Sequence, residues 1–149
     1  MQIYNNEVEK FRYRNDKKDG TGLYELNYYI CKMPEAKDDL QVRWLKLRIR
    51  LKERFDIKPD MDGILFLIGI QELGSGKKEF SKEEKQDLMH IAVCTVLSLS
   101  GYYKLEGVDD DRWPHYLQLK PLPEYDMIEQ ENFLKDHILL YFQNQQFID

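Results

Sequence analysis

The chain has 149 residues, of which 42% are hydrophobic and 13% aromatic, and its formal net charge is −5. This composition excludes a disordered chain, and the length is typical of one domain, so we expect a single domain over residues 1–149. The longest uninterrupted apolar stretch, residues 64–70, is far shorter than the roughly 20 residues of a membrane-spanning helix.

The cellular setting follows from the cysteines and the first residues. The two cysteines, Cys31 and Cys94, match no metal-ligand spacing, and the first ten residues contain no apolar targeting segment. These features predict a soluble protein of a reducing, bacterial-style cytoplasm.

In chain order, residues 1–20 are expected to be a loosely ordered N-terminal segment, because they end in the polar run Asn15–Gly20. Residues 23–31 fit a strand or a helix, with a slight preference for a helix. A helix start is predicted at Pro34, since proline is preset for the first helical position.

The segment that follows is predicted to be a helix. An apolar stripe runs along it at helical spacing, through Leu40, Trp44, Leu47, Leu51 and Phe55. Residues 45–52 also alternate as a strand would, but the stripe extends beyond the alternation and the residues are good helix formers. A further helix is expected through residues 64–73, with Asp60 or Asp62 as its cap and Gly74 at its end.

The clearest helix start is Ser81, which forms a capping box with Glu84. This helix should run to Ser100 and form the buried centre, because its second half is almost entirely apolar. Residues 102–107 and 113–120 are predicted to be two strands around an acidic tip. A last helix is predicted to begin near Asp126, and its apolar side would consist of Met127, Leu134, Ile138 and Tyr141 or Phe142. The predicted fold is mainly α, with four to five helices around a buried central helix and one antiparallel β-hairpin.

Charge is distributed unevenly along the chain. Residues 1–60 hold 14 Lys and Arg against 11 Asp and Glu, whereas residues 61–149 hold 8 against 16. Within residues 43–54, six side chains are basic and one is acidic. The candidate partner-binding residues are Arg43, Trp44, Lys46, Arg48, Arg50 and Arg54. Repulsion along this helix should be offset by solvent and the acidic C-terminal half, or by an acidic partner.

Two other motifs are weaker. Gly74–Lys77 lacks the first glycine and the hydroxyl residue of a phosphate-binding P-loop, so a helix end and a flexible link are expected. His90 and Cys94 are one helical turn apart, but a zinc site needs three or four ligands. We expect His90 to be a hydrogen-bonded core histidine and Cys94 to be an inert buried thiol.

The acidic tip offers hard oxygen ligands. Asp109, Asp111 and His115 are the weak candidates for a metal site, but position 113 is tryptophan and position 120 is lysine, where a calcium loop needs an oxygen ligand and a glutamate. Aspartates favour turns because they accept hydrogen bonds from backbone amides. A hairpin turn is therefore the preferred interpretation, and no cofactor is predicted.

Three segments resemble an uncharacterised bacterial protein family of no known function: residues 63–74, 85–94 and 101–115. The resemblance implies a cytoplasmic bacterial protein and transfers no activity or site residue.

These observations favour a small non-enzymatic interaction or regulatory domain that uses the basic helix, residues 43–54, against an acidic protein or a second copy of itself. The alternative is a nucleic-acid-associated protein that binds through the same basic stripe. It is disfavoured, because the helix before the hairpin is apolar and the hairpin tip is acidic. A small enzyme that draws on His90, Asp111 or His115 is the third hypothesis.

Overall fold

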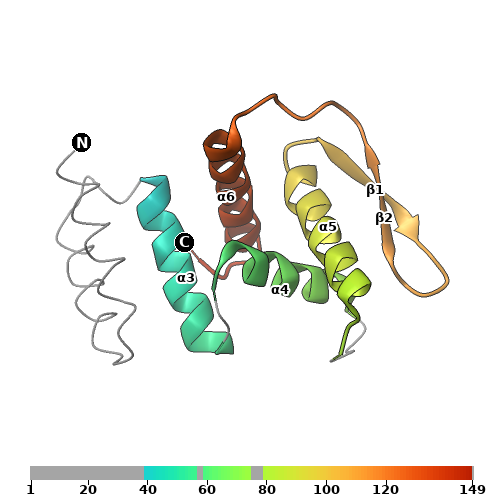
Figure 1. Ribbon diagram of the computed structural model, residues 1–149, viewed down its shortest axis with the longest axis horizontal. Coiled ribbons are helices and arrows are strands. Elements are labelled where there is room, and N and C mark those ends of the chain that lie inside the picture. Colours follow the sequence, from blue (N-terminus) through green and yellow to red (C-terminus); the bar gives the residue numbers. More distant parts are fainter. Residues whose placement is uncertain (1–38, 57–58, 75–78, 149) are drawn as a thin grey trace. The chain divides into compact units, whose positions relative to one another are not determined.

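A computed structural model describes residues 39–56, 59–74 and 79–148. In these residues, four helices and a two-stranded antiparallel sheet follow one another along the chain (Figure 1). They are α3 (Leu40–Phe55), α4 (Met61–Leu73), α5 (Lys82–Ser98), β1 (Tyr103–Val108), β2 (Pro114–Gln118) and α6 (Met127–Asn144). The predicted fold class, mainly α with one antiparallel hairpin, is therefore confirmed.

The chain forms two compact units, residues 1–49 and 50–149, and the boundary between them falls within α3. Four predictions concern residues outside the described ranges: the loose segment 1–20, the ambiguous segment 23–31, the helix start at Pro34 and the flexible link after Gly74.

Residues 40–55 are a helix throughout, so the helical interpretation of the alternating stretch is correct. Asp39 satisfies its first amides, because the Asp39 Oδ1 atom accepts hydrogen bonds from Gln41 N at 2.8 Å and Val42 N at 3.3 Å. Buried apolar side chains of α3 include three of the predicted stripe, Trp44, Leu47 and Leu51, and two outside it, Val42 and Ile49.

Helix α4 begins and ends as its sequence predicts. Asp60 caps the first turn by accepting a hydrogen bond from Gly63 N at 2.8 Å, and Gly74 ends the helix with a left-handed φ of 62°. Midway along α4, Gly69 lies directly against α5. A Cβ atom at this position would lie 2.3 Å from the carbonyl oxygen of Leu88. The two helix backbones therefore meet at a point where only glycine fits.

Helix α5 is the centre of the second unit. The capping box at its start is present in full, with Ser81 N bonded to Glu84 Oε2 at 2.8 Å and Glu84 N bonded to Ser81 Oγ at 3.1 Å. The helix contacts α4, α6 and both strands (Figure 1). The predicted central helix is confirmed.

Strands β1 and β2 pair antiparallel, with Tyr103 opposite Gln118 and Leu105 opposite Tyr116. A bulge between Leu105 and Gly107 shifts the register before the turn. The hairpin is attached to α5 by a hydrogen bond of 2.9 Å between Tyr116 Oη and Thr95 Oγ1. Because the Thr95 hydroxyl donates its proton to the Ile91 carbonyl at 2.8 Å, Tyr116 is the donor to Thr95.

Helix α6 also starts with a complete capping box, formed by Asp126 and Glu129. Burial along α6 begins only at Lys135, so the expectation that Met127 would lie on the buried side is wrong; Met127 is 86% exposed. The first turn of α6 precedes the buried residues of this helix in the sequence. Near the other end, the Tyr141 hydroxyl donates to Glu72 Oε1 at 2.7 Å and links α6 to α4.

Candidate functional site

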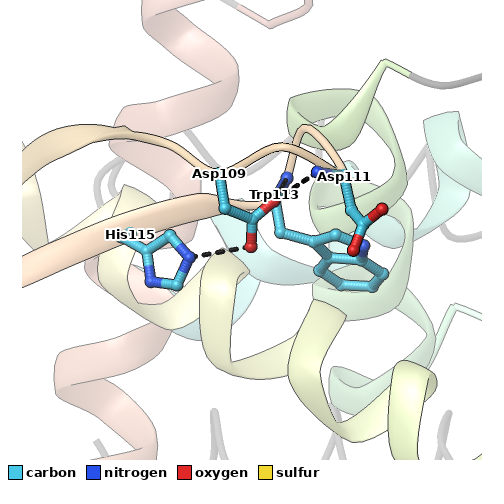
Figure 2. Close-up of polar contacts among 4 residues, drawn as sticks. All are labelled: Asp109, Asp111, Trp113 and His115. Atoms are coloured by element: carbon cyan, nitrogen blue, oxygen red, sulfur yellow. Dashed lines mark hydrogen bonds and ion pairs between the residues drawn. The ribbon is translucent and has the colours of Figure 1, made fainter.

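The hairpin tip is organised by one carboxylate. Asp109 Oδ1 accepts hydrogen bonds from the amides of Asp111 at 3.0 Å and Trp113 at 2.9 Å, and Asp109 Oδ2 lies 2.9 Å from His115 Nε2 (Figure 2). The hydrogen bond from His115, followed by those from the amides of Trp113 and Asp111, lowers the pKa of Asp109. Asp109 thus closes the turn with both of its carboxylate oxygens.

The structure brings together two of the three candidate metal ligands. Asp109 and His115 are hydrogen-bonded to each other, whereas the side chain of Asp111 extends away from them beside Trp113 (Figure 2). Arg112 has a left-handed φ of 67°, which completes the tight turn. In residues 39–56, 59–74 and 79–148, no group of three or more His, Cys, Asp and Glu side chains is arranged to hold a metal ion. The described geometry is that of a hairpin turn.

Of the pair on α5, Cys94 is buried as expected, whereas His90 is exposed. Cys94 Sγ lies 3.6 Å from His90 Nε2, so the two side chains are in contact. Cys94 is 1% exposed, and burial raises the pKa of its thiol to about 11, which keeps it protonated and unreactive near neutral pH. The expectation of a core histidine at position 90 is wrong, because His90 is exposed. Its contact partner Cys94, one helical turn further along α5, is buried.

The basic residues of α3 have different surroundings. Trp44 is only 6% exposed, so its indole is part of a buried layer. Arg43, Lys46 and Arg48 are partly exposed, and Arg50, Lys52 and Arg54 are exposed. Arg50 Nη1 donates a 2.9 Å hydrogen bond to the carbonyl of Phe147. The acceptor of this hydrogen bond lies in the acidic C-terminal half, but it is a neutral backbone carbonyl and not a carboxylate.

Large apolar side chains are exposed mainly in one segment. In the described part of the chain, eight of the ten such residues lie between positions 105 and 128. We call these eight the exposed apolar set: Leu105, Val108, Leu117, Leu119, Leu122, Tyr125, Met127 and Ile128. These residues are close together in the sequence, and exposed apolar side chains mark an interaction site where they form a contiguous surface.

A second polar arrangement was not predicted from the sequence. Ser100 Oγ lies 2.8 Å from His137 Nε2, and His137 Nδ1 lies 2.7 Å from the carbonyl oxygen of Phe133. Ser100 follows α5 and His137 is on α6, 37 residues later. No local sequence pattern links residues so far apart, so only the contact between α5 and α6 reveals the pair.

Aromatic rings surround this histidine. The ring centroids of Phe133 and His137 are 4.4 Å apart, and Tyr102 and Tyr125 each lie 5.5 Å from Phe133. The Lys120 ammonium is 4.1 Å from the centroid of the Tyr102 ring, which is a cation–π contact. His137 is therefore part of an aromatic cluster, and the Lys120 ammonium lies over one ring of this cluster.

No helix in the described ranges is both long enough and apolar enough to span a membrane. Comparison with protein-family models, with curated proteins and with solved structures found no match to this chain.

Proposed function

We propose that this protein is a non-enzymatic interaction domain that binds another protein. The observation that carries this proposal is the exposed apolar set, which gathers most of the exposed large apolar side chains in residues 105–128. Burying such side chains in a protein interface stabilises a complex by about 25 cal/mol per Å² of apolar surface, before the costs of association.

The register of the hairpin supports this role. Tyr116 reaches α5 from β2, and successive side chains of a strand point to opposite faces. His115 and Leu117 therefore lie on the face of β2 turned away from α5, and Leu119 follows the strand. The two leucines are 48% and 54% exposed. This outer face can accept a partner without disturbing the contact between the hairpin and α5.

The basic side of α3 supports a preference for an acidic partner. Lys52 and Arg54 are exposed in the last helical turn and, within the described residues, form no ion pair. Exposed charges of one sign accelerate encounter with an oppositely charged surface and select against like-charged proteins. The exposed apolar set would contribute contact area, and the basic side chains would contribute selectivity.

The proposal is tested by site-specific photo-crosslinking in the native cell. A benzophenone amino acid at position 119 should capture one protein reproducibly, whereas the same group at Lys85, exposed on α5, should not. With the captured protein purified, the double variant Leu117→Ser/Leu119→Ser should bind about tenfold more weakly or worse, since such a loss corresponds to about 1.4 kcal/mol.

A second variant tests the contribution of the basic side chains separately from that of the exposed apolar set. Lys52→Glu/Arg54→Glu should slow association with the purified partner, and the difference from wild type should shrink as salt is added. Equal binding by the wild type and both variants would contradict the proposal. A shift of duplex DNA by the protein that weakens steeply with salt and is lost on reversal of Arg48, Arg50 and Arg54 would instead support the nucleic-acid alternative.

A further inference from the structure

Ser100, His137 and the carbonyl of Phe133 have the arrangement of a nucleophile, its base and the group that orients the base. The two hydrogen-bonding distances are 2.8 and 2.7 Å. An activated serine requires these contacts, because the hydroxyl is a weak nucleophile until a neighbouring base accepts its proton. We propose that Ser100 is a nucleophilic hydroxyl that accepts acyl groups from activated esters, with His137 as its general base.

The hydrogen bonds define the tautomer of the imidazole. A backbone carbonyl can only accept, so the 2.7 Å contact with Phe133 places the proton of the neutral ring on His137 Nδ1. His137 Nε2 then carries a lone pair, and Ser100 must donate to it. The backbone of α6 thus holds the imidazole in the form that can take the serine proton.

The two residues differ in exposure in the way that such a reaction requires. Ser100 is exposed, so an ester can reach its oxygen, whereas His137 is 9% exposed and its ring is held against Phe133. Tyr102, whose ring centroid is 6.3 Å from that of His137, adds a second aromatic surface. These rings favour esters with an aromatic or apolar group.

The reaction is balanced without a further reagent. Ser100 Oγ forms a bond to the carbonyl carbon of the ester while its proton passes to His137 Nε2. The bond from that carbon to the leaving oxygen then breaks, and the leaving oxygen takes the proton from the imidazolium. The products are an O-acyl serine at position 100 and a free alcohol or phenol, with His137 neutral again.

The backbone around Ser100 limits the reaction to slow acyl transfer. An enzyme that turns over esters stabilises the oxyanion with free amides. Here the amides of Ser100 and Tyr102 donate to the Leu97 carbonyl, and that of Gly101 donates to the Ser98 carbonyl. We therefore expect stoichiometric acylation of Ser100 rather than rapid hydrolysis. The inference does not depend on the proposed interaction function.

The chain provides internal controls for the test. Ser81 is exposed, but its hydroxyl accepts a hydrogen bond from Glu84 N and has no basic partner among the described residues. Ser98 is at the same end of α5 as Ser100, and its hydroxyl donates to the carbonyl of Thr95 at 2.6 Å. A carbonyl cannot take a proton at neutral pH, so both serines should react slowly.

The experiment treats the full chain with p-nitrophenyl acetate and locates the acetyl groups by peptide mass spectrometry. Ser100 should be acetylated about 100-fold faster than Ser81 or Ser98, because a positioned base contributes on the order of 10²–10⁴ in rate. Ser100→Ala should remove the initial release of one equivalent of p-nitrophenolate, whereas Ser81→Ala should leave it unchanged.

His137→Gln keeps a hydrogen-bond acceptor near Ser100 and removes the base, so acetylation of Ser100 should fall about 100-fold. Circular dichroism checks that this variant is folded; if it is not, the relative rates at Ser100, Ser81 and Ser98 in the wild type decide the question. Acetylation of Ser100 in the wild type at the rate of Ser81 would overturn the proposal. Unchanged acetylation of Ser100 in a folded His137→Gln variant would also overturn it.

Discussion

The crossing of α4 and α5 and the hairpin that follows α5 are stabilised in different ways. At the crossing, Gly69 allows the two backbones to touch, and Ile64, Ile68 and Leu88 are completely buried. In the hairpin, the described side chains of β1 and β2 are exposed or only partly buried. The tip is closed by the polar side chain of Asp109.

The difference separates the part of the protein that apolar burial stabilises from a part that leaves apolar side chains exposed. Burial of apolar side chains stabilises the helical crossing, where close packing leaves no room for change. The hairpin is stabilised by local hydrogen bonds and by its attachment to α5 through Tyr116, so its apolar side chains remain in solvent. A surface of this kind can bind a partner without loss of the fold.

The largest effect is expected at the crossing. Gly69→Ala should lower the free energy of unfolding by about 3 kcal/mol or more, because the new Cβ atom would clash with the backbone oxygen of Leu88. The matched control is Gly74→Ala, whose Cβ would meet no atom closer than 3.9 Å and whose left-handed φ costs about 1 kcal/mol. Urea denaturation measures both; equal losses would mean that α4 moves away from α5 at little cost.

The attachment of the hairpin to α5 should have an intermediate effect. Tyr116→Phe removes the donor to Thr95 Oγ1 and should cost about 1 kcal/mol. A double-mutant cycle with Thr95→Val should give a coupling free energy of roughly 0.5–1 kcal/mol. Tyr102→Phe is the control, because the Tyr102 hydroxyl forms no hydrogen bond with the described residues. Additive effects of the two substitutions would show that the bond does not hold the hairpin in solution.

The hairpin tip should respond to pH. The pKa of Asp109 is lowered in the folded protein, so the stabilisation from its ionised form is present above the ordinary carboxyl pKa of about 3.9 and is lost as the pH falls through the lower folded value. Acidification through that range should lower the protection of the Asp111 and Trp113 amides against hydrogen exchange severalfold, with each rate compared to that of an unstructured peptide at the same pH. NMR measures this exchange.

Two substitutions at this carboxylate separate its contributions to the tip. Asp109→Asn keeps the acceptor for both amides and loses the charge beside His115, so it should have a smaller effect than Asp109→Ala. Identical exchange rates in the two variants would assign the order of the tip to the charge alone.

The smallest effect on stability is expected in the exposed apolar set. Leu119→Ser and Met127→Ser should change the free energy of unfolding by less than about 0.5 kcal/mol, because these side chains are 54% and 86% exposed. Thermal unfolding measures the change, with Leu88→Ala as the buried control, for which a loss of about 2–5 kcal/mol is expected. A large loss at Leu119 would mean that this residue is buried in the native protein.

The local rules that predicted the helices are short-range, and this is why they succeeded. Ser81 and Glu84 satisfy each other's backbone amides within one turn, and Asp60 and Gly74 act at the ends of α4 in the same way. The hairpin turn was also predictable, because positions 113 and 120 lack the oxygen ligands that a calcium loop needs and aspartates favour turns. The amide contacts of Asp109 span only four residues.

The sequence by itself determined the order and the ends of most described elements, the central position of α5 and the acidic hairpin tip, because these depend on contacts within a few residues and on apolar periodicity. Only the tertiary structure decided that His90 and Met127 are exposed and that Ser100 meets His137. These depend on how α5 and α6 pack, and residues 37 positions apart carry no local signal of their contact. Local bonding and periodicity determined the elements, and packing determined the sites.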